Sequence, residues 1–129
     1  MKPGNAMDWI VLVIILLVLG GFLFLRLGGT VSADEARRYL REGALLVDVR
    51  TPEEFAGGRV PGAINIPLSA LPDAMAIHAP DKSHVLLLHC RSGGRSAIAA
   101  RKLRSAGYTR VFNVGSFGRA QRLGTEGQP

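Results

Sequence analysis

Cysteine is almost missing from this sequence of 129 residues, in which position 90 holds the single one. The protein therefore forms no intramolecular disulfide, and a lone thiol survives best in a reducing compartment. Aromatic side chains are also scarce, at 6% of residues. The net charge of +6 is therefore not accompanied by the aromatic side chains on which nucleic-acid bases stack. We expect no nucleic-acid partner.

Charged side chains are missing from residues 9–25, which read WIVLVIILLVLGGFLFL. A helix of that length rises roughly 26 Å, close to the hydrocarbon thickness of a bilayer. Trp9 and Arg26 suit the two membrane interfaces. We expect a transmembrane helix over residues 9–26 that binds the lipid bilayer, a short flank over residues 1–8 and a hinge over residues 27–31.

A cleaved secretory signal is the alternative, because Val31-Ser32-Ala33 has small residues at a spacing that signal peptidase accepts. It would leave a secreted or periplasmic protein. Asp8 directly before the apolar run and the length of that run count against it. Ser32 and Glu35 also form a Ser-x-x-Glu capping box, which cleavage after Ala33 would disrupt. We therefore favour a retained single-pass anchor.

Basic residues are distributed unevenly along the chain. The apolar segment is preceded by Lys2 and followed by Arg26, Arg37, Arg38 and Arg41. The positive-inside rule then places the C-terminal domain on the cytoplasmic side of a bacterial-type inner (plasma) membrane. Acidic residues are absent between Lys82 and Thr125. We interpret the basic residues at positions 101–104 as a solvated helix face. The alternative is that the basic residues of this region attract an anionic substrate or anionic lipid.

Alternating strand and helix signals fill residues 32–124. Short apolar runs predict strands over residues 44–49, 63–67, 85–89 and 111–114. Cap signals predict helices from Ser32 to Gly43, from Thr51, over residues 69–77, and from Ser96 to Gly107. This pattern indicates an α/β domain with a mainly parallel sheet covered on both faces. The polar tail is expected to fray from Gly118, with residues 125–129 disordered.

The single cysteine follows the most apolar of these strands and precedes a glycine-rich turn, in the sequence HCRSGGRS of residues 89–96. Ligands of parallel α/β sheets bind beyond the carboxyl ends of the strands. There Cys90 would face backbone N–H groups and a helix N-terminus, which lower a thiol pKa. Gly93 and Gly94 let the backbone curl, and Arg95 adds positive charge. We therefore interpret Cys90 as a nucleophile, with a buried structural cysteine as the alternative.

The three histidines are weaker candidates. His89 is expected to point into the core or to bond the loop backbone, with a role in lowering the thiol pKa as the minority interpretation. His78 and His84 lie in turn regions, and we assign them no function.

The loop from Cys90 to Ser96 resembles the active-site loop of rhodanese-type sulfurtransferases. Residues 45–71, LLVDVRTPEEFAGGRVPGAINIPLSAL, are similar to a second motif of that family. The resemblance extends from about Val31 to Gly124. It implies a rhodanese-like five-stranded parallel sheet flanked by helices, over residues 32–124.

The same resemblance implies an activity and its residues. Cys90 would take sulfane sulfur from a donor, become a persulfide and pass the sulfur to a nucleophilic acceptor. The loop that binds the substrate would comprise Arg91, Ser92, Gly93, Gly94 and Arg95, and the supporting residues would be Asp48, Arg50, Arg59 and Ser96. The implied partners are small sulfur donors and acceptors or a protein persulfide, with no metal and no cofactor besides the covalent persulfide.

Two positions of this sequence depart from the pattern of the family. Arg59 stands where many members have histidine, and no tryptophan follows Gly115, which leaves the last helix undefined.

Two functions are alternatives to sulfur transfer. A cysteine phosphatase or arsenate reductase is one, but its loop has five intervening residues where this chain has four between Cys90 and Arg95. A non-catalytic rhodanese-like module at the membrane is the other, and the retained cysteine counts against it.

Overall fold

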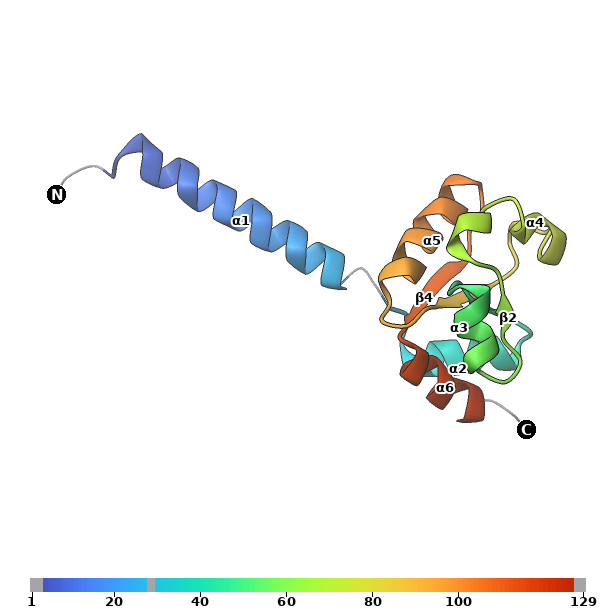
Figure 1. The fold of residues 1–129 in the computed structure, drawn as a ribbon. Helices are drawn as coiled ribbons and strands as arrows, with labels where there is room; N and C mark the ends of the chain where they lie inside the picture. The colour runs from blue at the N-terminus through green and yellow to red at the C-terminus, as the bar shows by residue number, and fades with distance from the viewer. Residues whose placement is uncertain (1–3, 28–29, 127–129) are drawn as a thin grey trace.

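A long apolar helix projects from the rest of the molecule at its N-terminal end. The computed structural model describes residues 4–27 and 30–126, and in it α1 runs from Ala6–Leu27 (Figure 1). Residues 6–23 have a mean hydropathy of 2.6, and none of that window is buried inside the protein. Its length and composition suffice to cross a bilayer, and a signal sequence near the N-terminus has the same properties. The interpretation of residues 27–31 as a hinge falls partly on residues 28–29, outside the described residues.

The remainder is built on a parallel sheet. Its strands are β1 (Leu45–Asp48), β2 (Ile64–Asn65), β3 (Leu86–His89) and β4 (Val111–Gly115), in the order β2-β1-β3-β4. These strands fall where the apolar runs predict them, because a strand of a parallel sheet that is covered on both faces reads as a continuous apolar run. All carboxyl ends therefore lie along one edge, where β3 ends at His89.

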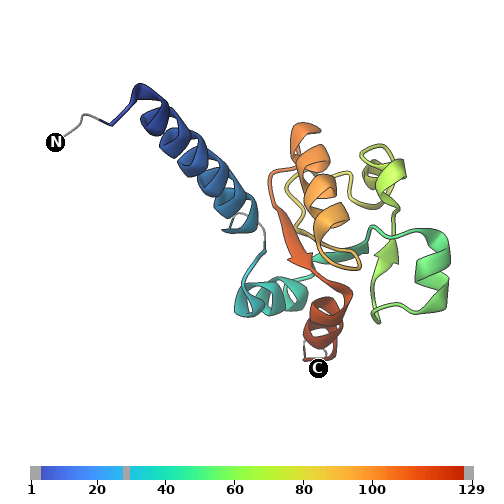
Figure 2. The same cartoon turned by 60° about the vertical axis from the view of Figure 1, so that its left-hand side comes forward.

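Helices cover both faces of the sheet, and each face has its own apolar core. On one face α2 (Ala33–Arg41) and α6 (Phe117–Glu126) bury Ala36, Ala120 and Leu123 against Leu46 and Leu87. The opposite face is covered by α5 (Gly94–Ser105), α4 (Met75–His78) and η1 (Leu68–Ala70). Figure 2 shows α5 on one side of β4 and α2 with α6 on the other. The layered α/β fold is thus the predicted one.

The sheet has four strands within the described residues, so the expectation of five strands is corrected to four. Val31 lies beside β4 and donates its N–H to the carbonyl of Asn113 at 2.9 Å. The next residue, Ser32, already caps α2 by accepting the N–H of Glu35. Because a helix begins there, the pairing with β4 stops after one hydrogen bond and no strand forms.

Two further expectations differ from the structure. The helix over residues 69–77 is divided into η1 and α4, and Pro72, which lacks an N–H group, lies between them. Fraying from Gly118 is also wrong as far as Glu126, because α6 occupies this segment and buries Ala120 and Leu123. The expected disorder of residues 127–129 falls outside the described residues.

The predicted helix boundaries are otherwise confirmed. Thr51 caps α3 (Pro52–Gly57) in a reciprocal box with Glu54, and Pro52 occupies the first turn. Gly43 and Gly107 follow the ends of α2 and α5 with φ values of 95° and 98°. These local signals set the start of α3 and the ends of α2 and α5.

Candidate active site around Cys90

Cys90 lies directly after β3, at the carboxyl edge of the sheet and before the first turn of α5. It is 1% exposed, and its backbone N–H donates to the carbonyl of Gly115 at 3.1 Å. The loop then folds back so that the N–H of Gly93 points at Cys90 Sγ, with 3.0 Å between nitrogen and sulfur. Strand, loop and helix together direct a backbone donor at the sulfur, as the sequence predicted.

The surroundings of the sulfur favour the thiolate. Burial raises the pKa of Cys90, but hydrogen bonds from the Ser96 hydroxyl and from the backbone N–H groups of Ser96, Gly93 and Ser92 outweigh it. The net effect holds the pKa of Cys90 below its ordinary value. A lowered thiol pKa increases the fraction of nucleophilic thiolate at neutral pH.

Ser96 is fully buried, and its hydroxyl has three neighbours. The oxygen lies 2.7 Å from Asn113 Oδ1, 3.1 Å from the Gly93 carbonyl and 3.5 Å from Cys90 Sγ. A hydroxyl has one proton to donate, so these acceptors share it. Ser96 therefore lies beside the Cys90 sulfur and is connected to a second polar side chain.

That side chain, Asn113, is a residue that the sequence interpretation missed. Its Oδ1 also accepts the N–H of Gly115 at 2.9 Å, and its Nδ2 donates to the carbonyl of Gly93 at 3.3 Å. The signal was present, because Asn113 is a lone amide in the apolar run VFNV of β4. A buried amide within a strand needs several polar partners, and here Gly93, Ser96 and Gly115 supply them.

A close backbone approach fixes the path of the loop. Gly93 has φ 98°, and a Cβ atom built on it would lie 3.4 Å from the Cα of Gly115. Beyond Gly115, the N–H of Phe117 donates to the carbonyl of Arg91 at 3.2 Å. The Cys90 loop is thus attached to the turn between β4 and α6, and glycine at position 93 meets both the φ angle and the space.

Arg95 is paired with a carboxylate and does not provide a free positive charge. Its guanidinium donates to both oxygens of Glu54, at 2.6 and 3.0 Å. The Arg95 hydrogen bonds hold the pKa of Glu54 down at about 2, and burial opposes them only in part. This bidentate pair connects α5 to α3 across the edge of the sheet. Sequence reasoning predicted a helix from Thr51 but did not identify Glu54 as the partner of Arg95.

Asp48 and Arg50 form a buried pair beside the loop. Arg50 Nη2 donates to Asp48 Oδ2 at 2.7 Å and to the carbonyl of Gly58 at 2.6 Å. Burial raises the pKa of Asp48, but the neighbouring His89 and the Arg50 hydrogen bonds bring it far below its ordinary value. The guanidinium of Arg50 also lies 4.5 Å from the ring centroid of Phe117. The pair therefore braces α3 and the start of α6.

Two other predicted positions have different surroundings. His89 is fully buried with its Nε2 3.5 Å from Asp48 Oδ2, and neither ring nitrogen has a hydrogen-bond partner within the described part of the chain. Arg59 is exposed and lies over the ring of Phe55 at 5.2 Å. The structure records no contact between Arg59 and the Cys90 loop among the residues it describes.

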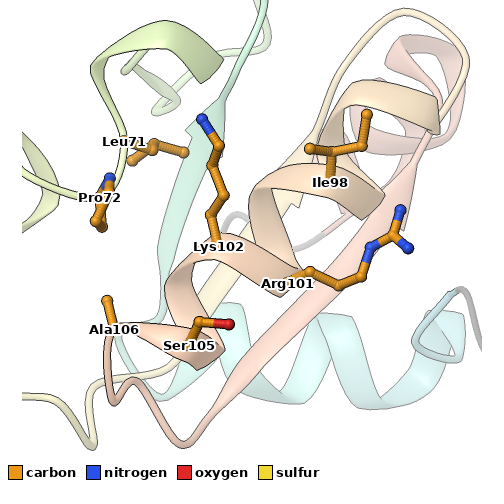
Figure 3. Close-up of a pocket in the computed structure, with 7 residues that line it drawn as sticks. All are labelled: Leu71, Pro72, Ile98, Arg101, Lys102, Ser105 and Ala106. Atoms are coloured by element: carbon orange, nitrogen blue, oxygen red, sulfur yellow. The ribbon is translucent and has the colours of Figure 1, made fainter.

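Two surface hollows differ in their relation to the cysteine. One, of about 410 Å³, is lined by Arg91 of the loop together with Arg50, Glu53, Glu54, Gly57, Gly58 and Phe117. Another, of about 560 Å³, has Leu71 and Pro72 on one side and the outer face of α5 on the other (Figure 3). Arg101 and Lys102 on that face are exposed, as a solvated helix face predicts. The first hollow borders the Cys90 loop at Arg91, whereas no loop residue lines the second.

A family model described as a rhodanese-like domain matches residues 32–117, which is more than half of the chain. The chain belongs to the rhodanese-like domain family. The matched segment contains β1 to β4 and the whole Cys90 loop, so the rhodanese-like domain and the candidate site coincide.

Similar proteins include several with a named activity. The thiosulfate sulfurtransferase PspE of Escherichia coli is 41% identical over 69 residues, which are 54% of this chain and 66% of PspE. A human thiosulfate:glutathione sulfurtransferase is 39% identical over 97 residues, covering 65% of this chain and 84% of that protein. The chain thus spans just under two thirds of the length of PspE.

The rhodanese-like fold is also found among solved structures. The human single-domain sulfurtransferase TSTD1 superimposes with a TM-score of 0.59 at 37% identity, covering 78% of this chain and 98% of that chain. A rhodanese with anions from E. coli gives a TM-score of 0.58 at 36% identity, covering 60% of this chain and 91% of that chain. The rhodanese-like domain of this chain therefore has the fold of proteins described as sulfurtransferases.

Proposed function

We propose that this chain is a sulfurtransferase that carries sulfane sulfur as a persulfide on Cys90. The observation that carries the proposal is the set of hydrogen-bond donors around one buried sulfur atom, with the Gly93 nitrogen 3.0 Å from Sγ. Fixed N–H donors stabilise an anionic sulfur as they stabilise an oxyanion. Relatives at 39% and 41% identity that are named sulfurtransferases support the same class of reaction.

The reaction is proposed as two displacements at sulfur. In the first, the Cys90 thiolate attacks the terminal sulfur of thiosulfate, the S–S bond of the donor breaks and sulfite leaves. A persulfide donor reacts in the same way and leaves as a thiolate. In the second, a nucleophilic acceptor attacks the outer sulfur of the Cys90 persulfide, and Cys90 leaves as a thiolate stabilised by the loop donors. No cofactor beyond this covalent sulfur is required.

The shape of the site suits a donor with an exposed terminal sulfur. Cys90 is 1% exposed, which favours a reactant that presents a single terminal atom to Sγ. Thiosulfate and persulfides both present a single terminal sulfur. We propose that the loop from Arg91 to Arg95 receives this group, and that the Asp48–Arg50 and Glu54–Arg95 pairs keep the surrounding elements in place.

We propose further that α1 is retained as a membrane anchor, with the domain on the cytoplasmic side. Cleavage after Ala33 would remove two residues that the fold uses. The Val31 side chain is buried in the core under α2 and α6, and its carbonyl accepts a hydrogen bond from Arg119 Nη2 at 2.6 Å. Ser32 caps α2. A reporter fused after Pro129 that works only in the periplasm would contradict the cytoplasmic assignment.

Intact-mass measurement of the purified chain tests the chemistry. Incubation with thiosulfate should add one sulfur atom, and cyanide should release it as thiocyanate. Cys90→Ser should abolish both results. A chain that never acquires sulfur, or one that hydrolyses an aryl phosphate and ignores thiosulfate, would overturn the sulfurtransferase proposal in favour of a binding module or a phosphatase.

A further inference from the structure

The chain enters the domain at the same edge of the sheet that carries Cys90. Val31 is fixed to β4 by its hydrogen bond to Asn113 and is held from the other side by Arg119. One residue earlier, the methyl group of Thr30 lies against Gly115, where an added Cβ would be 3.3 Å from Thr30 Cγ2. Because Gly115 is the last residue of β4, this entry point is at the carboxyl edge of the parallel sheet.

Gly115 is also a direct support of the Cys90 loop. Its carbonyl accepts the N–H of Cys90, and its Cα lies against Gly93. Gly115 therefore lies directly between Thr30 and the reactive loop. The opposite edge of the sheet, where Gly43, His84 and Arg110 precede the strands, is farther away by the length of β4, roughly 15 Å.

The connection to α1 is too short to let this edge move far from a membrane. The helix ends at Leu27, and three Cα steps to Thr30 span at most roughly 11 Å. The headgroup region of one leaflet is itself roughly 5–8 Å thick. If α1 crosses the bilayer, Thr30 and Gly115 must lie in or just beyond the headgroup region.

We propose that the edge of the sheet carrying the Cys90 loop faces the lipid surface, so that sulfur is exchanged next to the headgroups. This inference rests on the proposed retention of α1 as an anchor. Arg91 is exposed on the loop and carries the positive charge that an anionic headgroup attracts. Glu53 and Glu54 line the same hollow as Arg91, and Glu54 is paired with Arg95.

Fluorescence quenching from the lipid surface tests this orientation. In the full-length chain carrying Cys90→Ser, a single cysteine is introduced by Arg91→Cys on the loop or by His84→Cys on the opposite edge. Each variant is labelled with an environment-sensitive dye and placed in phosphatidylethanolamine and phosphatidylglycerol vesicles that contain a headgroup spin label. Quenching should be severalfold stronger at position 91. Equal quenching, or stronger quenching at position 84, would overturn the proposal.

A linker variant provides the matched control. Replacing residues 28–29 with a long Gly/Ser segment should remove most of the difference between the two labels, because a flexible tether releases the domain from the surface. Failure of the native chain to float with vesicles would overturn both the anchor and this orientation. Flotation with normal sulfur loading but no difference in quenching would overturn the orientation alone and leave the proposed function standing.

Discussion

The Ser96 hydroxyl has one proton for three acceptors, at 2.7 Å (Asn113 Oδ1), 3.1 Å (the Gly93 carbonyl) and 3.5 Å (Cys90 Sγ) from its oxygen. When Cys90 ionises, the thiolate becomes the stronger acceptor and should attract the single proton. Ser96→Ala removes this donor, so the pKa of Cys90 should rise. The pH profile of Cys90 alkylation should then shift to higher pH, and sulfur loading at neutral pH should slow.

Ser92→Ala is the matched control for this prediction. Position 92 supplies a backbone N–H to the sulfur, and alanine keeps that group. Its alkylation profile should therefore stay close to that of the native chain. If Ser96→Ala leaves the profile unchanged as well, the Ser96 hydroxyl donates to Asn113 in both states of Cys90, and only backbone donors stabilise the thiolate.

The Glu54–Arg95 pair should make the stability of the fold depend on pH, in a direction that follows from the hydrogen bonds between the two side chains. The pKa of Glu54 is lowered from 4.5 to about 2, chiefly by the Arg95 hydrogen bonds. A carboxyl group whose pKa is lower in the folded state than in the unfolded state stabilises the folded state. This stabilisation is complete at pH values above the pKa of the unfolded state and is lost as pH falls towards the pKa of the folded state. The difference in unfolding free energy between the native chain and Glu54→Gln should thus be greatest near neutral pH and should diminish between about 4.5 and 2.

Glu53→Gln supplies the control, because this carboxylate lies in the same turn of α3 and makes no ion pair with Arg95. Chemical denaturation at a series of pH values, followed by circular dichroism, measures both variants. A pH-independent difference for Glu54→Gln would mean that the pair contributes through packing and not through charge.

At the level of elements, the junction between the Cys90 loop and β4 depends on glycine at position 93. Gly93→Ala must place a side chain at φ 98° and 3.4 Å from Gly115. The left-handed conformation costs about 1–2 kcal/mol, so the unfolding free energy should fall by that amount and sulfur loading should decline. Gly94→Ala meets nothing within 4 Å and begins α5, so its stability should change by less than about 0.5 kcal/mol.

The elements that the sequence predicts well are those with local signals. Thr51 and Pro52 mark the start of α3, and the apolar runs mark every strand of the described sheet, because caps and burial patterns depend on neighbours in sequence. The position of Cys90 before a helix N-terminus follows from the same signals. Its loop chemistry could therefore be inferred without a structure.

The features that escaped prediction depend on distant residues. The α6 helix forms in a polar, glycine-rich segment because Ala120 and Leu123 find a core that includes Val60, far away in the sequence. Asn113 and Glu54 are ordinary polar residues until the fold brings them to Gly93 and Arg95. The resemblance to a family suggested a fifth strand, but a helix cap at Ser32 ended that pairing.

At the level of the whole molecule, the fate of α1 can be decided by comparing two truncations. Removal of residues 1–27 keeps Val31 and the Ser32 cap, whereas removal of residues 1–33 reproduces the product of signal cleavage. The second loses the Ser32 cap of α2, both hydrogen bonds of the Val31 backbone and the buried Val31 side chain. It should be less stable than the first by at least about 3 kcal/mol, as measured by denaturant unfolding. Equal stability would remove the structural argument against cleavage.

The short connection between α1 and the Cys90 edge also predicts a preference among sulfur acceptors. In vesicles, the loaded chain should transfer sulfur to a thiol-bearing phosphatidylethanolamine in preference to a soluble thiol. Replacing residues 28–29 with a long flexible linker should lower the ratio of the two rates severalfold, because effective concentration falls with about the −3/2 power of tether length. The rate with the soluble thiol should stay constant, which shows that the chemistry at Cys90 is intact. An unchanged ratio would mean that the acceptor meets Cys90 away from the membrane surface.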